Sequence, residues 1–193
     1  MTIIKRFFDI VCSLVGIIIF IPVYIVIYIL LKSTSRGPAI FKQERIGKDG
    51  KPFYIYKFRT MIPNTEEDGI PLLAEVNDER LTSFGKFLRE HHLDELPQLW
   101  NVLRGDMSFV GYRPERKYFI DKIMEQRPDY AELYRMRPGI TSKATLYNGY
   151  TNTMEKMTRR LDMDLEYLNN YSLLLDMKIV TDTFLSILFG KKF

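Results

Sequence analysis

A pair of adjacent acids, Asp94 and Glu95, stands near several arginines and is the strongest candidate for chemistry in this chain. Arg89 precedes the pair, Arg113 follows it, and Arg137 begins an Arg-Pro-Gly motif. Two carboxylates alone repel an anionic diphosphate, whereas guanidinium groups and a divalent cation offset that repulsion. A carboxylate in such surroundings can attack phosphorus and form an acyl phosphate. The pattern therefore favours phosphate chemistry.

The same two acids also have a simpler interpretation. A helix is predicted directly after them from apolar residues at positions i, i+3, i+4 and i+7, namely Leu96, Leu99, Trp100 and Leu103. Pro97 fits within its first turn and Gly105 is a plausible stop. Acids at a helix N-terminus cap the helix or complement its dipole, although backbone amides there can also bind a phosphate. The local pattern leaves both interpretations open.

Two further elements are predicted from short-range patterns. Ile40–Phe41 and Phe53–Phe58 flank the turn signal Gly47–Gly50, which predicts a β-hairpin. From Asn77 onward the spacing becomes helical, with Gly85 inside an apolar face made of Leu81, Phe84, Phe87 and Leu88.

The run Ile10–Leu31 has 22 residues without charge, Asn or Gln, which predicts a membrane segment. Pro22 removes an amide donor near the middle and predicts a kink. Lys5–Arg6 precede the run, and Lys32 and Arg36 follow it, so both flanks carry the positive charge typical of the cytoplasmic side. Arms of roughly 15 to 18 Å would reach the bilayer centre and return. A re-entrant helix and a single tilted span stay equally open.

Composition limits which other functions and sites the chain can have. The chain carries 28 Lys+Arg against 24 Asp+Glu, and residues 32–60 hold eight basic residues against two acidic ones. A basic stretch after a membrane segment suits anionic lipid headgroups. Nucleic-acid binding is disfavoured because the acidic block Glu66–Glu95 follows. With Cys12 as the only cysteine and His91 and His92 as the only histidines, an intrachain disulfide and a structural zinc site are excluded.

The C-terminal third predicts an apolar helix capped by Ser172 and running toward Phe189. Its only charged residues are Asp176, Lys178 and Asp182. Such a helix either packs in the core or against a partner subunit, or it lies in the bilayer interface. Lys191–Lys192 suit an anionic lipid surface or a helix C-terminus.

Taken in order, these motifs resemble the small monotopic phosphoglycosyl transferases, bacterial sugar transferases that begin the assembly of surface glycans. The resemblance covers nearly the whole chain and lies in Lys5–Asp9, Phe41–Gly47, Tyr56–Met61, Leu93–Leu99, Asn101–Gly111 and Arg137–Thr141. It implies an α+β, mainly helical fold with interfacial helices. Residues 1–36 would form a re-entrant, kinked helix, and residues 37–193 a cytosolic catalytic domain on the inner leaflet of the bacterial cytoplasmic membrane. A homodimer is compatible with it.

The resemblance also implies a reaction and a cofactor. A sugar 1-phosphate would pass from a UDP-sugar to polyprenyl (undecaprenyl) phosphate, releasing UMP, by a ping-pong route through a covalent aspartyl intermediate. Asp94 matches the nucleophile and Glu95 the Mg²⁺ ligand, with Asp94 beside the metal, while Arg89 and Arg113 match phosphate-binding positions. Further candidates for substrate binding are Asp164, Lys57, Arg59 and Arg137.

Three departures from the family pattern concern the membrane turn and the substrate loops. Ile21 stands before Pro22 where many members have Ser, Tyr112 replaces a Pro, and Ser142-Lys143 replaces Gly-Trp. The identity of the sugar is therefore not carried over. Two other classes stay open: a non-enzymatic membrane scaffold for glycan-assembly proteins, and a hydrolase of lipid-linked phosphates. Release of UMP from a UDP-sugar separates the transferase from both.

Overall fold

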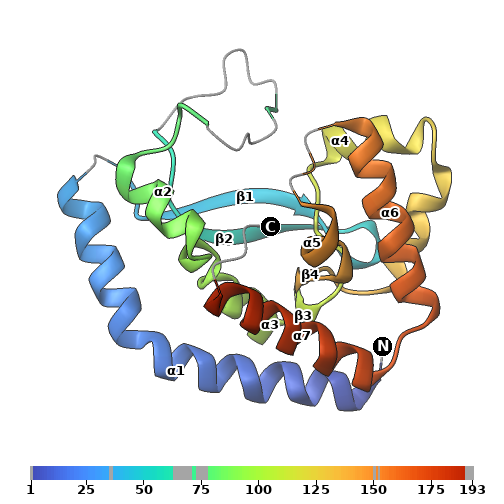
Figure 1. Cartoon of the computed structure of the whole chain (residues 1–193), viewed down its shortest axis with the longest axis horizontal. Coiled ribbons are helices and arrows are strands. Elements are labelled where there is room, and N and C mark those ends of the chain that lie inside the picture. The colour runs from blue at the N-terminus through green and yellow to red at the C-terminus, as the bar shows by residue number, and fades with distance from the viewer. Residues whose placement is uncertain are drawn as a thin grey trace.

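The computed structural model describes residues 2–34, 37–62, 71–72, 78–149, 151 and 153–189. Over these residues it is mostly helical, with two small two-stranded sheets, which confirms the predicted mainly helical α+β class (Figure 1). The predictions that concern Arg36, Asn77, Lys191, Lys192 and the first part of the acidic block lie outside the described residues.

Helix α1 (Ile3–Thr34) is longer than the apolar run and continues through Pro22. Figure 1 shows it running along one side of the molecule and then bending. Pro22 lacks the amide donor that a straight helix needs, which explains a bend within an otherwise regular helix. By length and composition, α1 is the one described helix that could cross a membrane, consistent with membrane anchoring. We call residues 3–21 its N-terminal arm and residues 22–34 its C-terminal arm.

The two arms bury different kinds of side chain. The N-terminal arm buries Lys5, Asp9 and Ser13, whereas the C-terminal arm buries Ile27 and Leu31. Within each arm these residues are four positions apart, so each arm presents one stripe to the rest of the chain. Most other side chains of α1 are large, apolar and exposed. In the N-terminal arm the charged residues Lys5 and Asp9 therefore point toward protein, while most of the large apolar residues of α1 point outward.

The N-terminal arm is docked by buried polar contacts. Lys5 Nζ lies 2.6 Å from Asp176 Oδ2 and donates a 3.0 Å hydrogen bond to the Val110 carbonyl. Asp9 Oδ1 accepts from the Ser108 hydroxyl at 3.0 Å and from the Phe109 amide at 3.1 Å. We call this group the docking cluster. It connects the start of α1 to the middle and the end of the chain.

Strands β1 (Ile40–Ile46) and β2 (Pro52–Phe58) form the predicted antiparallel hairpin, joined by a 3-10 turn at Lys48–Gly50. The free edge of β2 is covered by one side chain from α3 (Gln98–Arg104). Asn101 Nδ2 donates to the Tyr54 carbonyl at 2.7 Å, and its Oδ1 accepts from the Tyr56 amide at 3.1 Å. A buried asparagine thus substitutes for a missing neighbouring strand.

Helix α2 (Ser83–Glu90) begins later than predicted. Leu81 was expected on its apolar face, but this residue lies before the helix and pairs with Met61 in an isolated bridge. Thr82 caps the helix by accepting from the Gly85 amide at 2.9 Å, which sets the first turn. At Gly85 a Cβ atom would lie 1.9 Å from the Thr60 carbonyl oxygen, so only glycine fits this crossing.

The remaining elements build the second sheet and its helical cover. Strands β3 (Ser108–Val110) and β4 (Gly139–Thr141) pair in parallel. The covering elements are α4 (Lys117–Met124), a 3-10 helix (Pro128–Arg135), α5 (Lys143–Asn148), α6 (Met154–Asn169) and α7 (Leu173–Leu188). The main core lies among them, with Val110, Tyr112, Ile120, Ile123, Leu133 and Leu161 among its fully buried residues.

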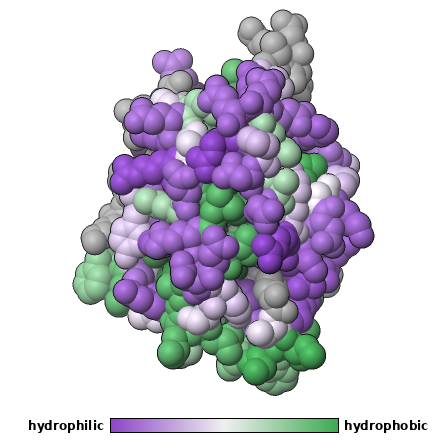
Figure 2. All heavy atoms as spheres, turned by 90° about the vertical axis from the view of Figure 1, so that its right-hand side faces the viewer, coloured by the Kyte–Doolittle hydropathy of each residue, from purple (hydrophilic) through white to green (hydrophobic). Residues whose placement is uncertain are grey.

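Helix α7 agrees with the prediction, since Ser172 caps it by accepting from the Leu175 amide at 3.1 Å. It lies alongside the N-terminal arm of α1 (Figure 1) and buries Asp176 and Ile179. Its outer face is apolar and exposed at Leu174, Met177, Phe184 and Leu188. Figure 2 shows apolar side chains gathered along the lower edge of the molecule, where α1 and α7 lie, and polar side chains above.

Candidate active site

Asp94 and Glu95 lie in a 3-10 turn, Leu93–Glu95, between α2 and α3. The prediction placed them at the N-terminus of the following helix, and the turn does lead into that helix through Pro97. His92 precedes the turn with a left-handed backbone (φ 54°), which is uncommon for a residue with a side chain. The acids are thus held on a short, sharply turned connection.

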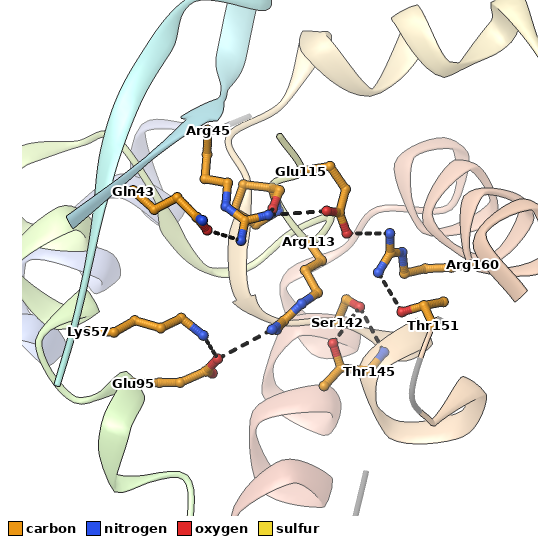
Figure 3. A network of polar contacts seen from close by, with 11 residues as sticks. Gln43, Arg45, Lys57, Glu95, Arg113, Glu115, Ser142, Thr145, Thr151 and Arg160 are labelled. Atoms are coloured by element: carbon orange, nitrogen blue, oxygen red, sulfur yellow. Dashed lines mark hydrogen bonds and ion pairs between the residues drawn. The ribbon is translucent and has the colours of Figure 1, made fainter. Parts of the chain in front are cut away.

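Glu95 is tied to two cations from different parts of the chain. Its Oε1 lies 2.5 Å from Lys57 Nζ on β2 and 3.5 Å from Nη2 of Arg113, which follows β3 (Figure 3). Burial opposes ionisation, yet the Lys57 ammonium and the Arg113 guanidinium hold the pKa of Glu95 well below its ordinary value. Glu95 is therefore an ionised carboxylate.

Asp94 has the opposite electrostatic character. Its side chain is almost fully buried, and burial raises its pKa to about 6, with Lys57 opposing the rise and Glu95 adding to it. The group is thus ionised at neutral pH but poorly solvated. A carboxylate in this condition is a better nucleophile than one held by a close cation, because it has less solvation and fewer hydrogen bonds to lose.

Arg89 supplies an unsatisfied donor near these acids. Its Nη1 is buried and has no hydrogen-bond partner among the residues that the structure describes. Its charge is one of those that lower the pKa of Asp94, so the guanidinium lies within electrostatic reach of that carboxyl. A buried N–H without a partner costs roughly 1–3 kcal/mol, which an anionic ligand would recover. Arg89 is therefore suited to bind phosphate.

Asp164 on α6 is a second buried acid. Burial raises its pKa to about 7, against the lowering by Arg160 and by hydrogen bonds from the Ser142 hydroxyl and the Arg113 amide. Its Oδ1 has no partner within the described part of the chain. The structure thus places the predicted residue Asp164 beside the backbone of Arg113, in a state that is partly protonated at neutral pH.

Three residues with no predicted role form a network next to Arg113. Glu115 lies 2.5 Å from Arg160 Nη2 and 3.1 Å from Arg45 Nη1, and Arg45 also donates to Gln43 Oε1 (Figure 3). Burial raises the pKa of Glu115, but Arg160 and Arg45 outweigh this effect and lower the pKa below its ordinary value. Their positions in the sequence could have indicated this network. Arg45 lies in the Phe41–Gly47 motif, and Glu115 follows Arg113 by two residues.

Two predicted site residues are not brought to the acids. Arg59 donates to the carbonyls of Pro38 at 2.6 Å and Leu31 at 3.3 Å, at the C-terminal end of α1. Arg137 donates to the Gly105 carbonyl at 2.7 Å, at the C-terminal end of α3. Cations at these positions satisfy terminal carbonyls and complement helix dipoles. These hydrogen bonds of Arg59 and Arg137 support the local structure.

The residues present fit a magnesium ion that shares its coordination with a substrate. No cluster of three or more His, Cys, Asp or Glu side chains occurs in the described ranges, so these residues do not enclose a metal by themselves. Mg²⁺ commonly takes one or two carboxylates together with phosphate oxygens and water. Asp94 and Glu95 supply two adjacent carboxylates, of which Glu95 is firmly ionised.

Comparisons with known proteins show the family of this chain. A family model described as bacterial sugar transferase matches residues 1–190. A UDP-N-acetylgalactosamine-undecaprenyl-phosphate N-acetylgalactosaminephosphotransferase of Aeromonas hydrophila is 40% identical over 187 residues, covering 97% of this chain and 44% of the relative. A UDP-glucose:undecaprenyl-phosphate glucose-1-phosphate transferase of Caulobacter vibrioides is 42% identical over 187 residues, covering 95% and 69%.

A third relative has nearly the same length as this chain. The exopolysaccharide production protein PSS of Rhizobium leguminosarum bv. phaseoli is 39% identical over 191 residues, covering 95% of this chain and 94% of the relative. By contrast, the chain spans less than half of the Aeromonas relative. The range matched by the family model, residues 1–190, includes the positions of both acids and of the arginines described above.

Proposed function

Because the chain belongs to the bacterial sugar transferase family, we propose that it transfers a sugar 1-phosphate from a UDP-sugar to a polyprenyl phosphate such as undecaprenyl phosphate, releasing UMP. The observation that carries this proposal is the buried Asp94, with its pKa raised to about 6, beside Glu95, which is ionised and tied to Lys57 and Arg113. Asp94 has the properties of a nucleophile, and Glu95 is held in place by its two cations.

In the first step, a carboxylate oxygen of Asp94 attacks the sugar-bearing β-phosphorus of the UDP-sugar. The bond from that phosphorus to the bridging oxygen breaks, and UMP leaves with the oxygen and its electron pair. Arg89, with its unpartnered Nη1, and Arg113 would bind the phosphates and stabilise the charge that develops on them. The product is a sugar phosphate held on Asp94 as an acyl phosphate.

In the second step, a phosphate oxygen of the acceptor attacks the same phosphorus and displaces Asp94. The bond to the carboxylate breaks, so the polyprenyl diphosphate sugar leaves and Asp94 returns as a carboxylate. No base is needed, because the attacking oxygen already carries negative charge. Glu95 stays paired with Lys57 during both steps. Its negative charge thus remains close to Arg113, one of the cations that would bind the phosphates.

Mg²⁺ would be held by Glu95, with Asp94 beside it, and when bound would offset the charge of the diphosphate. Chelation with EDTA should then abolish turnover, and Glu95→Gln should weaken it severely, since an amide is a poorer ligand for a hard cation. Full activity in chelator would remove the metal from the proposal.

For topology we propose that α1 enters and leaves the cytoplasmic leaflet of the bilayer on the same side. Support comes from both arms: Lys5 contacts Asp176, and Ile27 and Leu31 pack in the cluster that includes Phe58. A helix that crossed a bilayer core of about 30 Å would carry one end away from the catalytic domain. The exposed apolar face of α7 beside α1 would lie in the same interface.

Cysteine labelling tests this topology. In a Cys12→Ser background, Thr2→Cys should react with an impermeant reagent only after the cells are permeabilised. Glu132→Cys, an exposed position of the catalytic domain, provides the matched control and should behave identically. Labelling of Thr2→Cys from outside intact cells would establish a spanning helix instead.

The reaction itself is tested with purified protein, UDP-sugars and Mg²⁺. UMP release before acceptor is added, together with a mass gain of one sugar phosphate, supports the two-step route. UMP release only in the presence of undecaprenyl phosphate would favour direct transfer. Absence of UMP under all conditions, across a panel of UDP-sugars, would favour a scaffold.

A further inference from the structure

An apolar cavity of about 310 Å³ lies at the bend of α1, separate from the charged site. Both arms of α1 and the adjoining elements β2 and α3 contribute its walls, which include Ile17, Ile21, Tyr24, Tyr56, Pro97 and Trp100. The Tyr24 hydroxyl donates to the Leu96 carbonyl at 2.5 Å, so this polar group of the lining already has a partner. At the bend near Pro22, α1 therefore leaves a cavity between itself and the neighbouring elements.

The cavity opens toward the side where the bilayer would lie. Trp100 and Ile21 remain about half exposed although both line it, and their neighbours on α1 are exposed apolar residues. A nucleotide or a sugar would lose hydrogen bonds to water in such a site without replacing them. A ligand that fits this cavity is therefore a hydrocarbon chain.

A positive charge at the edge of the cavity indicates which kind of hydrocarbon chain it suits. Lys42 Nζ lies 5.6 Å from the centroid of the Tyr56 ring, so an exposed ammonium stands at one wall. The connection that carries Glu95 reaches the cavity: Tyr24 donates to the carbonyl of Leu96, and the next residue, Pro97, lines the wall, so the cavity ends close to the charged turn. An apolar cavity with cations at its edge complements an amphiphile that has an anionic phosphate head.

From this complementarity we infer that the cavity binds the first isoprene units of the acceptor and so guides its phosphate toward Asp94. The inference rests on the proposed function, because it specifies where that reaction's acceptor lies. It also gives the bend of α1 a role in substrate binding besides anchoring. A phospholipid acyl chain is the alternative occupant, which the experiment distinguishes.

Trp100 provides a direct readout because it is the only tryptophan of the chain. In mixed micelles, undecaprenyl phosphate should change the Trp100 emission saturably at a low mole fraction. Phosphatidylglycerol at the same mole fraction has a comparable charge and should leave the emission unchanged. Equal responses to both lipids would show a general lipid crevice and overturn the inference, and so would no response to undecaprenyl phosphate.

Two adjacent substitutions test the effect on transfer. Ile17→Phe narrows the cavity, whereas the matched control Ile18→Phe adds the same ring to the exposed side of α1. Ile17→Phe should raise the KM for undecaprenyl phosphate by about tenfold. Acceptor-independent UMP release should fall much less than this, and Ile18→Phe should match the unsubstituted protein. If the two variants behave alike, the cavity does not hold the acceptor.

The outcomes for the two proposals are distinguishable. A protein that never releases UMP refutes the proposed function, and the fluorescence titration still decides whether the cavity prefers polyprenyl phosphate. A protein that completes transfer normally while Ile17→Phe and Ile18→Phe give the same KM refutes only the role of the cavity.

Discussion

Buried charges occur in two regions of this molecule, and the two regions treat them differently. In the docking cluster Lys5 is bonded to Asp176, which also accepts from the Tyr167 hydroxyl. In the candidate active site Asp94 is held away from water with a raised pKa, and Arg89 keeps a buried nitrogen without a partner among the described residues. The Lys5–Asp176 pair is satisfied and holds two elements together, whereas Asp94 and Arg89 keep the capacity to bind and react. The contrast concerns that pair, since Asp9 Oδ2 in the docking cluster also has no partner among the described residues.

The largest effect expected from this comparison is that of Asp94→Asn. The adduct should disappear and turnover should fall about 1,000-fold or more, as for other nucleophile removals. Stability at pH 8 should nevertheless rise by about 3 kcal/mol, because the folded pKa of about 6 exceeds the ordinary 3.8 and the charged form is the destabilised one. The gain is present above about pH 6 and vanishes below about pH 4.

Intact-protein mass spectrometry and denaturant unfolding in detergent measure the two quantities. If Asp94 served only as a helix cap, its replacement would cost about 1 kcal/mol and leave the adduct in place. That combination of results would contradict the assignment of Asp94 as the reactive acid.

The reverse pattern is expected in the docking cluster. Lys5→Met leaves the buried Asp176 without its cation, so the free energy of unfolding should fall by roughly 3–5 kcal/mol. Combining it with Asp176→Leu should recover part of this loss, since the pair is then replaced by apolar groups. Equal unfolding midpoints for the single variant and the unsubstituted protein would show that this contact stabilises nothing.

A smaller effect should follow from exchanging one cation for another. Arg89→Lys keeps the charge but loses the planar fork that matches a phosphate, so kcat/KM for the UDP-sugar should fall about 10- to 100-fold. Stability should change little, because Arg89 Nη1 has no hydrogen bond to lose among the described residues. Lys117→Arg, an exchange at an exposed ion pair, provides the control and should leave both quantities unaltered.

The smallest predicted effect is on pH dependence. Asp94 must be ionised to attack, and its pKa lies at about 6, so acceptor-independent UMP release should drop about tenfold between pH 7 and pH 5. Asp164, with a pKa of about 7, titrates nearby, and Asp164→Asn separates the two groups. If the midpoint near pH 6 disappears in Asp164→Asn, the titrating group is not Asp94.

Local patterns in the sequence predicted several elements well. Turn residues and alternating apolar residues located the β1–β2 hairpin, and Ser172 marked the start of α7. The acid pair and its arginines could be recognised because they lie in short motifs. The start of α2 was predicted too early, since Leu81 has the spacing of a helical face but pairs with Met61, a contact that no local pattern encodes.

The roles of individual cations were harder to predict. Lys5 and Arg6 read as a positive membrane flank, yet Lys5 is buried on Asp176, and Arg6 donates to the carbonyls at the end of α3. Arg59 and Arg137 resembled substrate ligands, but Arg59 donates to the Pro38 carbonyl and Arg137 to the Gly105 carbonyl, both near helix ends. A sequence shows that a cation exists, whereas its partner is decided by chain segments far away.

The contact between Lys5 and Asp176 joins residues that are 171 positions apart. During synthesis the N-terminal arm leaves the ribosome before its partner on α7, which follows 171 positions later. At about 5–20 residues per second, this delay lasts roughly 10 to 30 s. Throughout that time the N-terminal arm lacks its partner on α7, and the bilayer or a chaperone would shield its apolar side chains. Early membrane targeting of the nascent chain would therefore protect this protein from aggregation before its catalytic part has folded.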